Sequence, residues 1–209
     1  MENKSTLLKD AFALFVITLV SGLVLSLVYV VTKEPIEVQA EARKMRAYQS
    51  IYAEAEEFIE DEELFALVSE VELTDLSSDY EGIEVVEINN ALDAEGNIIG
   101  YLVQLSTNKG YGGNISLAIG YSLDGILKGI ETLEINETAG LGAKASEADF
   151  KDQFADKKVD YFISTKVEAT TSNEISAISG ATVTTNAIVN AVNAGIDLLN
   201  KYSPVMEVG

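Results

Sequence analysis

The chain contains no cysteine and no histidine, and these two absences limit the chemistry that it can perform. Without cysteine there is no disulfide, no thiolate nucleophile and no ligand for an iron–sulfur cluster. Without histidine, a Ser–His–Asp or Cys–His nucleophile is excluded, and haem ligation and most catalytic zinc sites are disfavoured. Difficult chemistry must therefore come from an organic cofactor, or from carboxylates with a hard metal ion.

Positive charge is also scarce. The sequence has 14 Lys and Arg against 34 Asp and Glu, a formal net charge of -20 over 209 residues. Such a surface repels nucleic acid, anionic headgroups and free nucleotides. We therefore expect no nucleic-acid partner, and we expect that long-range attraction does not retain a phosphate-bearing ligand.

One long apolar run is present at residues 11–31, and it reads "AFALFVITLVSGLVLSLVYVV" with no charged residue. About 20 such residues span a bilayer, whereas the apolar part of a cleaved signal peptide is usually about 7–15 residues long. The run predicts an uncleaved transmembrane anchor in contact with membrane lipid, after a short tail at 1–10. Lysine and arginine lie on both sides of it, so charge alone leaves its orientation open.

A helical connecting region is expected at 32–80. Apolar residues at spacings of three and four predict a helix from Ala40 to about Phe58. The acidic stretch that follows, "EEFIEDEEL", is interpreted as a solvated face or loop, because it lacks the ligand pattern of a calcium loop.

A folded domain is expected at 81–209. Two hairpins are predicted, "GIEVVEINNAL" with "IIGYLVQLS" and "ISLAIGYS" with "LKGIETLEI", each joined by a turn that contains glycine. A helix with an apolar stripe is predicted from Asn186 to Tyr202. The expected fold class is α+β, an antiparallel sheet with packed helices, preceded by a single N-terminal transmembrane helix.

Three glycine-rich stretches punctuate this domain: "NKGYGGN", "NETAGLG" and "SGATVTT". None fits a dinucleotide-binding or P-loop pattern. The third opens the last helix, where free N–H groups and a partial positive charge favour a phosphate. The alternative is that the hydroxyls of Thr182, Thr184 and Thr185 only cap the helix. Lys109 lies in the first stretch and Lys144 lies two residues after the second, either as local positive charge for a ligand or as ordinary surface lysines.

These motifs together resemble a known family. "SGATVTT" resembles the S/T-G-A-T flavinylation motif of the FMN-binding domain family. "GYGGNISLAIGYSLDGILKGIETLEINETAGLG" resembles the same family's G-Y-x-G … E-T-x-G-L-G pattern, at the right distance upstream. With one N-terminal membrane helix and this length, the whole chain is most similar to the G subunits of Rnf electron-transport complexes.

The resemblance implies a cofactor and a role. FMN would be joined through a phosphoester bond to Thr182 by a flavin transferase that uses FAD and Mg²⁺. The domain at 81–209 would be extracytoplasmic, on a single-pass anchor in the cell membrane. The chain would relay electrons between reduced ferredoxin and NAD⁺ with other membrane subunits, coupled to Na⁺ or H⁺ translocation. It would not be a complete enzyme alone, and no catalytic residue or metal ligand is assigned.

The same resemblance implies a set of cofactor-binding residues. Leu141 is expected as an apolar contact of the isoalloxazine ring and Tyr111 as an aromatic one. The full set is Thr182, Ser179, Gly180, Ala181, Thr185, Thr138, Gly140, Leu141, Gly142, Tyr111 and Lys144.

One position departs from the family pattern. Ser176 stands six residues before Thr182, where the family usually carries Asp. This puts the efficiency of flavinylation in doubt, with Glu174 as a candidate substitute. Thr184 and Thr185 are competing targets for the modification.

Other functions stay open at this stage. The C subunit of the Na⁺-translocating NADH:quinone reductase shares the motif but is usually longer, and regulators with such a domain usually have more membrane helices. An alternative from a different functional class is an anchored binding or assembly module that has lost its flavin. A carboxylate-based hydrolase ranks last, because acidic pairs are too plentiful here to be informative.

Overall fold

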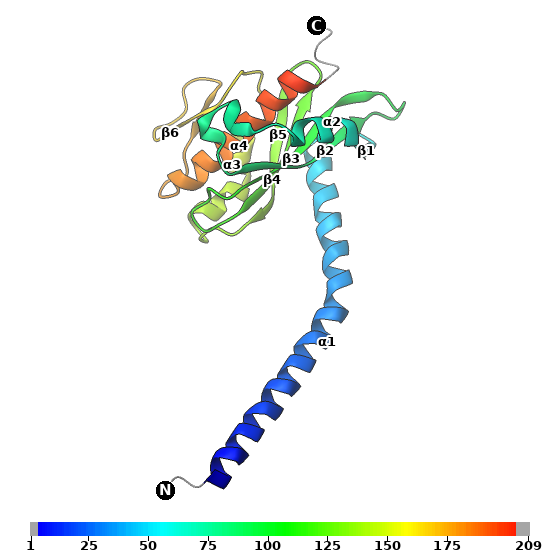
Figure 1. Cartoon of the computed structure of the whole chain (residues 1–209). Helices are drawn as coiled ribbons and strands as arrows, with labels where there is room; N and C mark the ends of the chain where they lie inside the picture. The colour runs from blue at the N-terminus through cyan, green and yellow to red at the C-terminus, as the bar shows by residue number, and fades with distance from the viewer. Residues whose placement is uncertain (1–3, 204–209) are drawn as a thin grey trace. The chain divides into compact units, whose positions relative to one another are not determined.

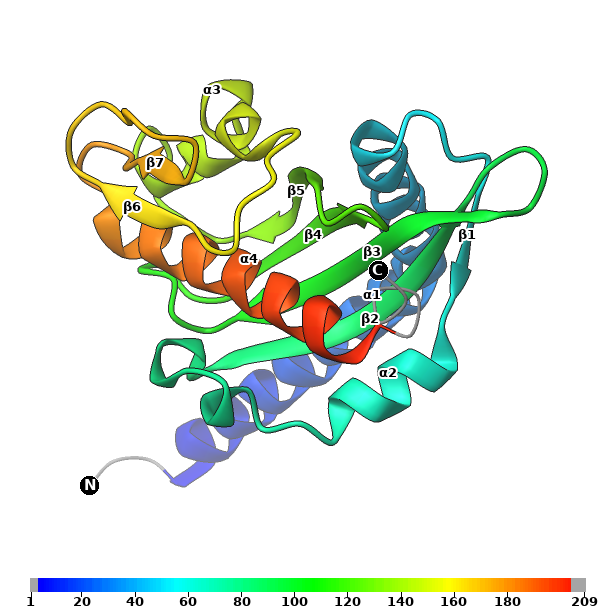
Figure 2. The same ribbon diagram turned by 90° about the horizontal axis from the view of Figure 1, so that it is seen from above.

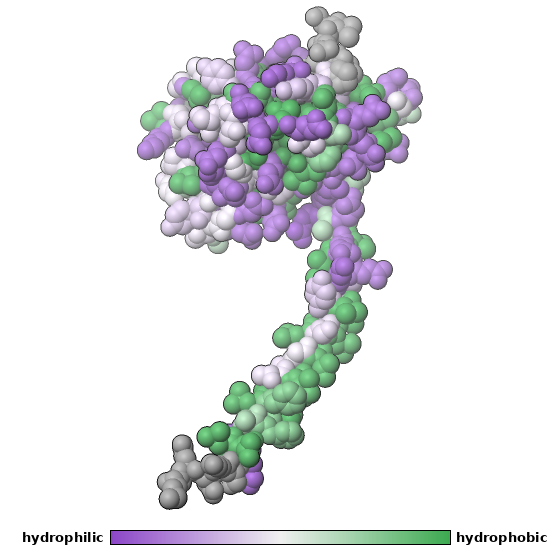
Figure 3. Space-filling view, viewed as in Figure 1, coloured by the Kyte–Doolittle hydropathy of each residue, from purple (hydrophilic) through white to green (hydrophobic). Residues whose placement is uncertain are grey.

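The computed structural model describes residues 4–203 and divides into two compact units, with the division between Lys44 and Met45. The first unit consists of most of α1 (Lys4–Ile51), shown in Figure 1. Among the described residues, this is the one helix long and apolar enough to cross a membrane. Figure 3 shows its apolar side chains (green), and the predicted span at 11–31 lies within it.

The helix predicted from Ala40 to Phe58 is wrong at both ends. It is the continuation of α1, which runs through Pro35 and ends at Ile51. Phe58 lies in strand β1 (Glu57–Glu60), opposite Ala91 of the neighbouring strand. The apolar spacing nevertheless identified residues that pack together. Phe58 packs against the cluster that contains Tyr48 and Tyr52, but it does so from a strand and not from a helix.

The acidic run is a solvated face, because its glutamate side chains are exposed, but it is not a loop. It forms β1 and then helix α2 (Glu62–Ser69), separated by Asp61. The Asp61 carboxylate caps α2 by accepting a hydrogen bond from Leu64 N at 2.9 Å. Two short 3₁₀ helices, η1 (Leu73–Asp75) and η2 (Ser78–Tyr80), follow, so the segment 32–80 contains a strand of the sheet as well as helices.

Five strands form one antiparallel sheet in the order β1-β2-β3-β4-β5. The two predicted hairpins are confirmed. They consist of β2 (Ile83–Leu92), β3 (Ile98–Thr107), β4 (Ile115–Ser122) and β5 (Leu127–Ile135). Their turns use Gly96 and Gly125 at positive φ, as tight hairpin turns require.

Helix α4 (Thr182–Tyr202) packs across one face of the sheet on β2, β3 and β4 (Figure 2). Its backbone comes close to the sheet at Gly195, where a Cβ would collide with Ile119 and touch Leu105. Thirteen of its 21 residues are buried, and nine of these belong to the main hydrophobic core. Its position is therefore set by burial along its whole length.

The other face of the sheet carries the end of α1. Tyr48, Ile51 and Tyr52 are buried there. Gly100 and Gly120 make this docking possible, because a side chain at either glycine would collide with Tyr52 or Ile51. Burial raises the pKa of the Tyr52 hydroxyl, and the nearby Glu54 carboxylate adds to the rise.

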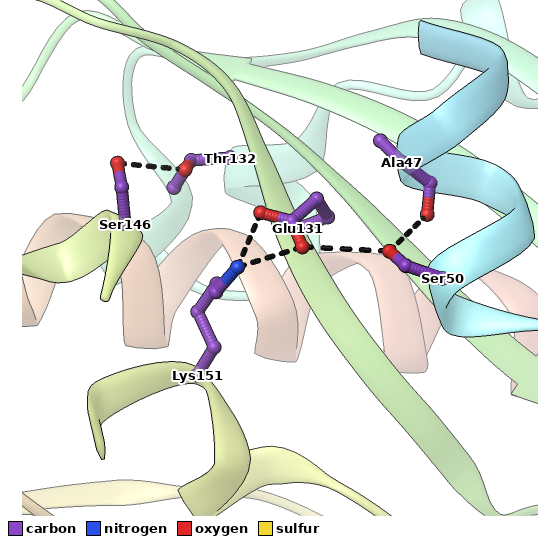
Figure 4. A network of polar contacts seen from close by, with 6 residues as sticks. All are labelled: Ala47, Ser50, Glu131, Thr132, Ser146 and Lys151. Atoms are coloured by element: carbon purple, nitrogen blue, oxygen red, sulfur yellow. Dashed lines mark hydrogen bonds and ion pairs between the residues drawn. The ribbon is translucent and has the colours of Figure 1, made fainter. Parts of the chain in front are cut away.

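A polar network fastens the segment after β5 to the sheet (Figure 4). Lys151 Nζ lies 2.5 and 2.7 Å from the two carboxylate oxygens of Glu131, and Glu131 is also 3.4 Å from the Ser50 hydroxyl. Thr132 donates to Ser146 at 2.8 Å. These contacts hold η3 (Gly142–Ser146) and α3 (Ala148–Lys151) against β5, and η4 (Asp152–Phe154), which follows, also packs on β5.

A second, parallel pair of short strands, β6 (Ile163–Thr165) and β7 (Glu174–Ser176), precedes α4. Asn193 of α4 joins it to the core by bonding both the N–H (2.8 Å) and the carbonyl (2.9 Å) of Phe162. The chain then leaves β7 directly into the "SGAT" turn. This pair was not predicted, since each strand has only three residues.

Candidate cofactor site

The three glycine-rich stretches meet at one edge of the sheet. Because the strands alternate in direction, the loop 108–114 between β3 and β4 and the loop 136–141 after β5 leave from the same edge. The N-terminus of α4 lies beside them. Together they enclose a cavity of about 430 Å³, a size typical of small-molecule sites.

The cavity gathers most of the residues predicted from the sequence. Seven of them line it: Tyr111, Thr138, Leu141, Gly142, Gly180, Ala181 and Thr182. Ser179, Thr185, Gly140 and Lys144 are not among its lining residues. Three lining residues were not predicted to contact the cofactor: Glu137, Val183 and Thr184. Each of the three lies inside one of the glycine-rich motifs, so its membership of the motif could have predicted its place at the cavity.

The hydroxyls at the start of α4 do not cap it, and that expectation is wrong. The helix begins at Thr182, four residues earlier than predicted, with Ala181 as the N-cap and no side-chain capping bond. Thr185 instead accepts a bond from Ile178 N (3.1 Å) and donates to Ala181 O (3.0 Å), which fastens the "SGAT" turn. The first-turn N–H groups therefore have no capping side chain at the cavity.

Thr184 carries an unsatisfied polar atom at the same place. Its side chain is 0 % exposed, and its Oγ1 has no hydrogen-bond partner within the described chain. A Cβ on Gly142 would lie 2.7 Å from this oxygen and 2.7 Å from Glu137 Oε2. Gly142 thus keeps the space beside the Thr184 hydroxyl open.

Apolar side chains stand at the opening of the cavity. Tyr111 is 78 %, Val183 52 % and Leu141 43 % exposed. Gly180 has a φ of +78°, and a Cβ there would come within 3.1 Å of Leu141 Cδ2. Exposed apolar groups around a polar floor suit a ligand with a flat apolar part and an anionic end.

The lysines do not converge on the cavity. Lys109 forms an ion pair with Glu81 at 2.9 Å, and Lys144 is exposed outside the lining. Among the described residues that line the cavity, only Glu137 carries a charge, and its charge is negative. An anion at this site must therefore be held by backbone N–H groups and hydroxyls.

Ser176 has a structural partner of its own. Its hydroxyl accepts a hydrogen bond from Ala169 N at 2.9 Å. Glu174 Oε2 accepts from Thr170 N (2.7 Å) and from the Thr170 hydroxyl (2.9 Å), and these bonds lower the pKa of Glu174. Both side chains hold the loop between β6 and β7, so Ser176 fills a structural place in the motif.

Comparison with known proteins places the chain in a family. Residues 110–197 match the FMN-binding domain, and residues 1–51 match the RnfG N-terminal region. The chain is 32% identical over 200 residues to the G subunit of the Na⁺-translocating ferredoxin:NAD⁺ oxidoreductase complex of Acetobacterium woodii, covering 93% of this chain and 92% of the relative. The chain belongs to the family of Rnf G subunits.

Other relatives in the family of Rnf G subunits agree. The G subunit of the ion-translocating oxidoreductase complex of Methanosarcina acetivorans is 27% identical, over 96% of this chain and 98% of its own. The proton-translocating counterpart of Clostridium ljungdahlii is 37% identical, over 50% of this chain and 56% of its own. The crystal structure of Shewanella oneidensis NqrC aligns with a TM-score of 0.49 at 19% identity, covering 59% of this chain and 61% of that one.

The cavity of this Rnf G subunit fits FMN. An uncapped 21-residue helix offers N–H groups to the phosphate, and the unpaired Thr184 hydroxyl offers a further donor. Leu141, Val183 and Tyr111, which line the cavity, would offer apolar surface to the ring system. The matched FMN-binding domain contains all ten lining residues.

We predict opposite effects from two valine substitutions one position apart. Thr184→Val removes a buried hydroxyl that has no partner, so the flavin-free chain should keep its stability or gain up to about 1 kcal/mol. It should also incorporate less FMN, because one donor to the phosphate is lost. Thr185→Val leaves Ile178 N–H without an acceptor and should cost about 1–3 kcal/mol.

Urea unfolding of the flavin-free full chain in detergent measures both effects. Incorporation of FMN by Thr184→Val is compared with wild type by intact mass, after co-expression of each chain with a flavin transferase. Equal destabilisation by the two substitutions would show that the Thr184 hydroxyl is already bonded without flavin, and would contradict its assignment to the ligand.

Proposed function

We propose that this chain is the membrane-anchored, FMN-carrying electron-transfer subunit of an Rnf-type ferredoxin:NAD⁺ oxidoreductase coupled to ion translocation. Its similarity to named G subunits extends over almost the whole chain. The observation that carries the proposal is the uncapped start of α4 in a cavity with the unpaired, buried Thr184 hydroxyl. Relatives named for Na⁺ and for proton translocation both match, so the proposed ion is Na⁺ or H⁺.

FMN is proposed to be attached covalently to Thr182. Three threonines stand in the motif, but Thr184 and Thr185 are 0 % exposed, and the Thr185 hydroxyl is bonded on both sides. Thr182 is partly exposed at the cavity, and its hydroxyl has no partner among the described residues. A flavin transferase would join the FMN phosphoryl group of FAD to Thr182 Oγ1 and release AMP.

The net charge of the domain gives a reason for attaching the flavin covalently. Residues 1–44 carry five basic and five acidic side chains, so the whole net charge of -20 lies on residues 45–209. Such a domain does not attract a free flavin phosphate. A phosphoester bond removes dissociation, and the local N–H groups then need only orient the cofactor.

The residues of the chain take separate roles around the flavin, which supplies the redox chemistry. The first-turn N–H groups of α4 and the Thr184 hydroxyl hold the phosphate end. Leu141, Val183 and Tyr111 cover the ring system and reduce its contact with water. No residue of this chain is assigned a catalytic step.

The domain is proposed to lie outside the cytoplasm, with α1 as a single-pass anchor in the cell membrane. Its partners are then the other membrane subunits of the complex, the surrounding lipid and, during maturation, the flavin transferase. The apolar part of α1 supports the anchor. The side of the membrane rests on the family resemblance.

Attachment is tested by intact mass and peptide mapping of the full chain co-expressed with a flavin transferase. We expect an added mass of one FMN less water, on the peptide with Thr182. Thr182→Ala should abolish it, whereas Thr182→Ser should keep part of it because the hydroxyl remains. Modification mapped to Thr184 or Thr185, or an unmodified wild type beside an active transferase, would sink the proposal.

Orientation is tested by labelling, for which a chain without cysteine is well suited. Glu95→Cys lies on the exposed β2–β3 turn, and Lys9→Cys lies before the apolar span. A membrane-impermeant maleimide should label intact cells carrying Glu95→Cys, and label Lys9→Cys only after lysis. The reverse pattern would place the domain in the cytoplasm.

A further inference from the structure

We propose that Glu137 is a positioning residue of the flavin site that lowers the reduction potential of the bound flavin. The proposal rests on the proposed function, because it concerns flavin held in the cavity. It assigns Glu137 two tasks: its carboxylate fixes the loop that carries Tyr111, and it places a negative charge in the wall of the cavity.

The first task follows from contacts between the loops. Glu137 Oε1 accepts a hydrogen bond from Tyr111 N at 2.7 Å, which joins the loop after β5 to the loop before β4. A Cβ on Gly110 would lie 2.9 Å from the same oxygen, and a Cβ on Gly142 would lie 2.7 Å from Oε2. Glycines on both sides thus leave room for this carboxylate.

The second task follows from the surroundings of the carboxylate. Glu137 is half-buried, and it is the only charged side chain among the described residues that line the cavity. Lys109 is engaged with Glu81, and Lys144 stands outside the lining. The lining therefore supplies no cation to neutralise Glu137, and beside a partly enclosed cavity its charge is less screened than it would be in water.

A fixed negative charge opposes reduction. Each electron that enters the flavin leaves a reductant, which is oxidised, and it adds one negative charge to the flavin unless a proton follows. The Glu137 carboxylate makes this added charge less favourable. The flavin is then harder to reduce and a stronger reductant for the next carrier.

The potential is measured on the full chain in detergent, after FMN has been loaded by co-expression with a flavin transferase. The chain is titrated with dithionite while the flavin absorbance and the solution potential are recorded. Glu137→Gln removes the charge and keeps an acceptor for Tyr111 N–H, so the midpoint potential should shift to more positive values. The matched control is Glu134→Gln, which removes the same charge from an exposed side chain three residues earlier. Its potential should equal that of wild type.

Three outcomes overturn the proposal. They are a wild-type potential in Glu137→Gln, an equal shift in Glu134→Gln, and a folded Glu137→Gln chain that fails to take up FMN. A wild-type chain without FMN in the mass spectrum would instead refute the proposed function, so the two failures are distinguishable.

The tether is tested separately by amide hydrogen exchange at Tyr111. Glu137→Ala should speed exchange there, because the acceptor is lost, whereas Glu137→Gln should not. Equal exchange in Glu137→Ala and wild type would overturn the first task.

Discussion

The burial of α4 against the sheet is the constraint on which the rest of the domain depends. Gly195 lets the helix lie close to Leu105 and Ile119, and apolar residues along its length complete the main core. A helix held so firmly has a fixed N-terminus, and here that end lies where two glycine-rich loops leave the sheet. The site is thus built at the end of a rigid element and not on a loop alone.

Around that end of the helix, several polar groups lack hydrogen-bond partners among the described residues. The helix lacks a side-chain cap, and the Thr184 hydroxyl is buried without a partner among the described residues. Both features cost stability in a flavin-free protein. A phosphate would satisfy them, even though the domain as a whole is strongly acidic, because short-range N–H donors act where the net charge does not reach. In the proposed function, the backbone N–H groups would orient the phosphate and a bond to Thr182 would retain the flavin.

The four long strands and most of the cavity lining could be predicted from the sequence, because alternating apolar residues, glycine turns and the motif letters are local signals. Prediction failed where tertiary contacts decide. Phe58 continues the spacing of a helix but pairs with Ala91 in a strand. Thr185 is a residue type that often caps helices, but its hydroxyl forms hydrogen bonds with the backbone of the preceding turn. Glu137 stood in a quoted motif and was passed over, since nothing local shows that its carboxylate reaches Tyr111 N.

The central claim is that the first turn of α4 is left open for the phosphate of the flavin, and hydrogen–deuterium exchange tests it most directly. Flavin-free and flavin-loaded full chains are compared over two peptides, one covering residues 179–186 and one covering 190–199. We expect slower exchange at 179–186 on loading, with no change at 190–199, which is already protected by the helix. Equal exchange at 179–186 in the two forms would contradict it.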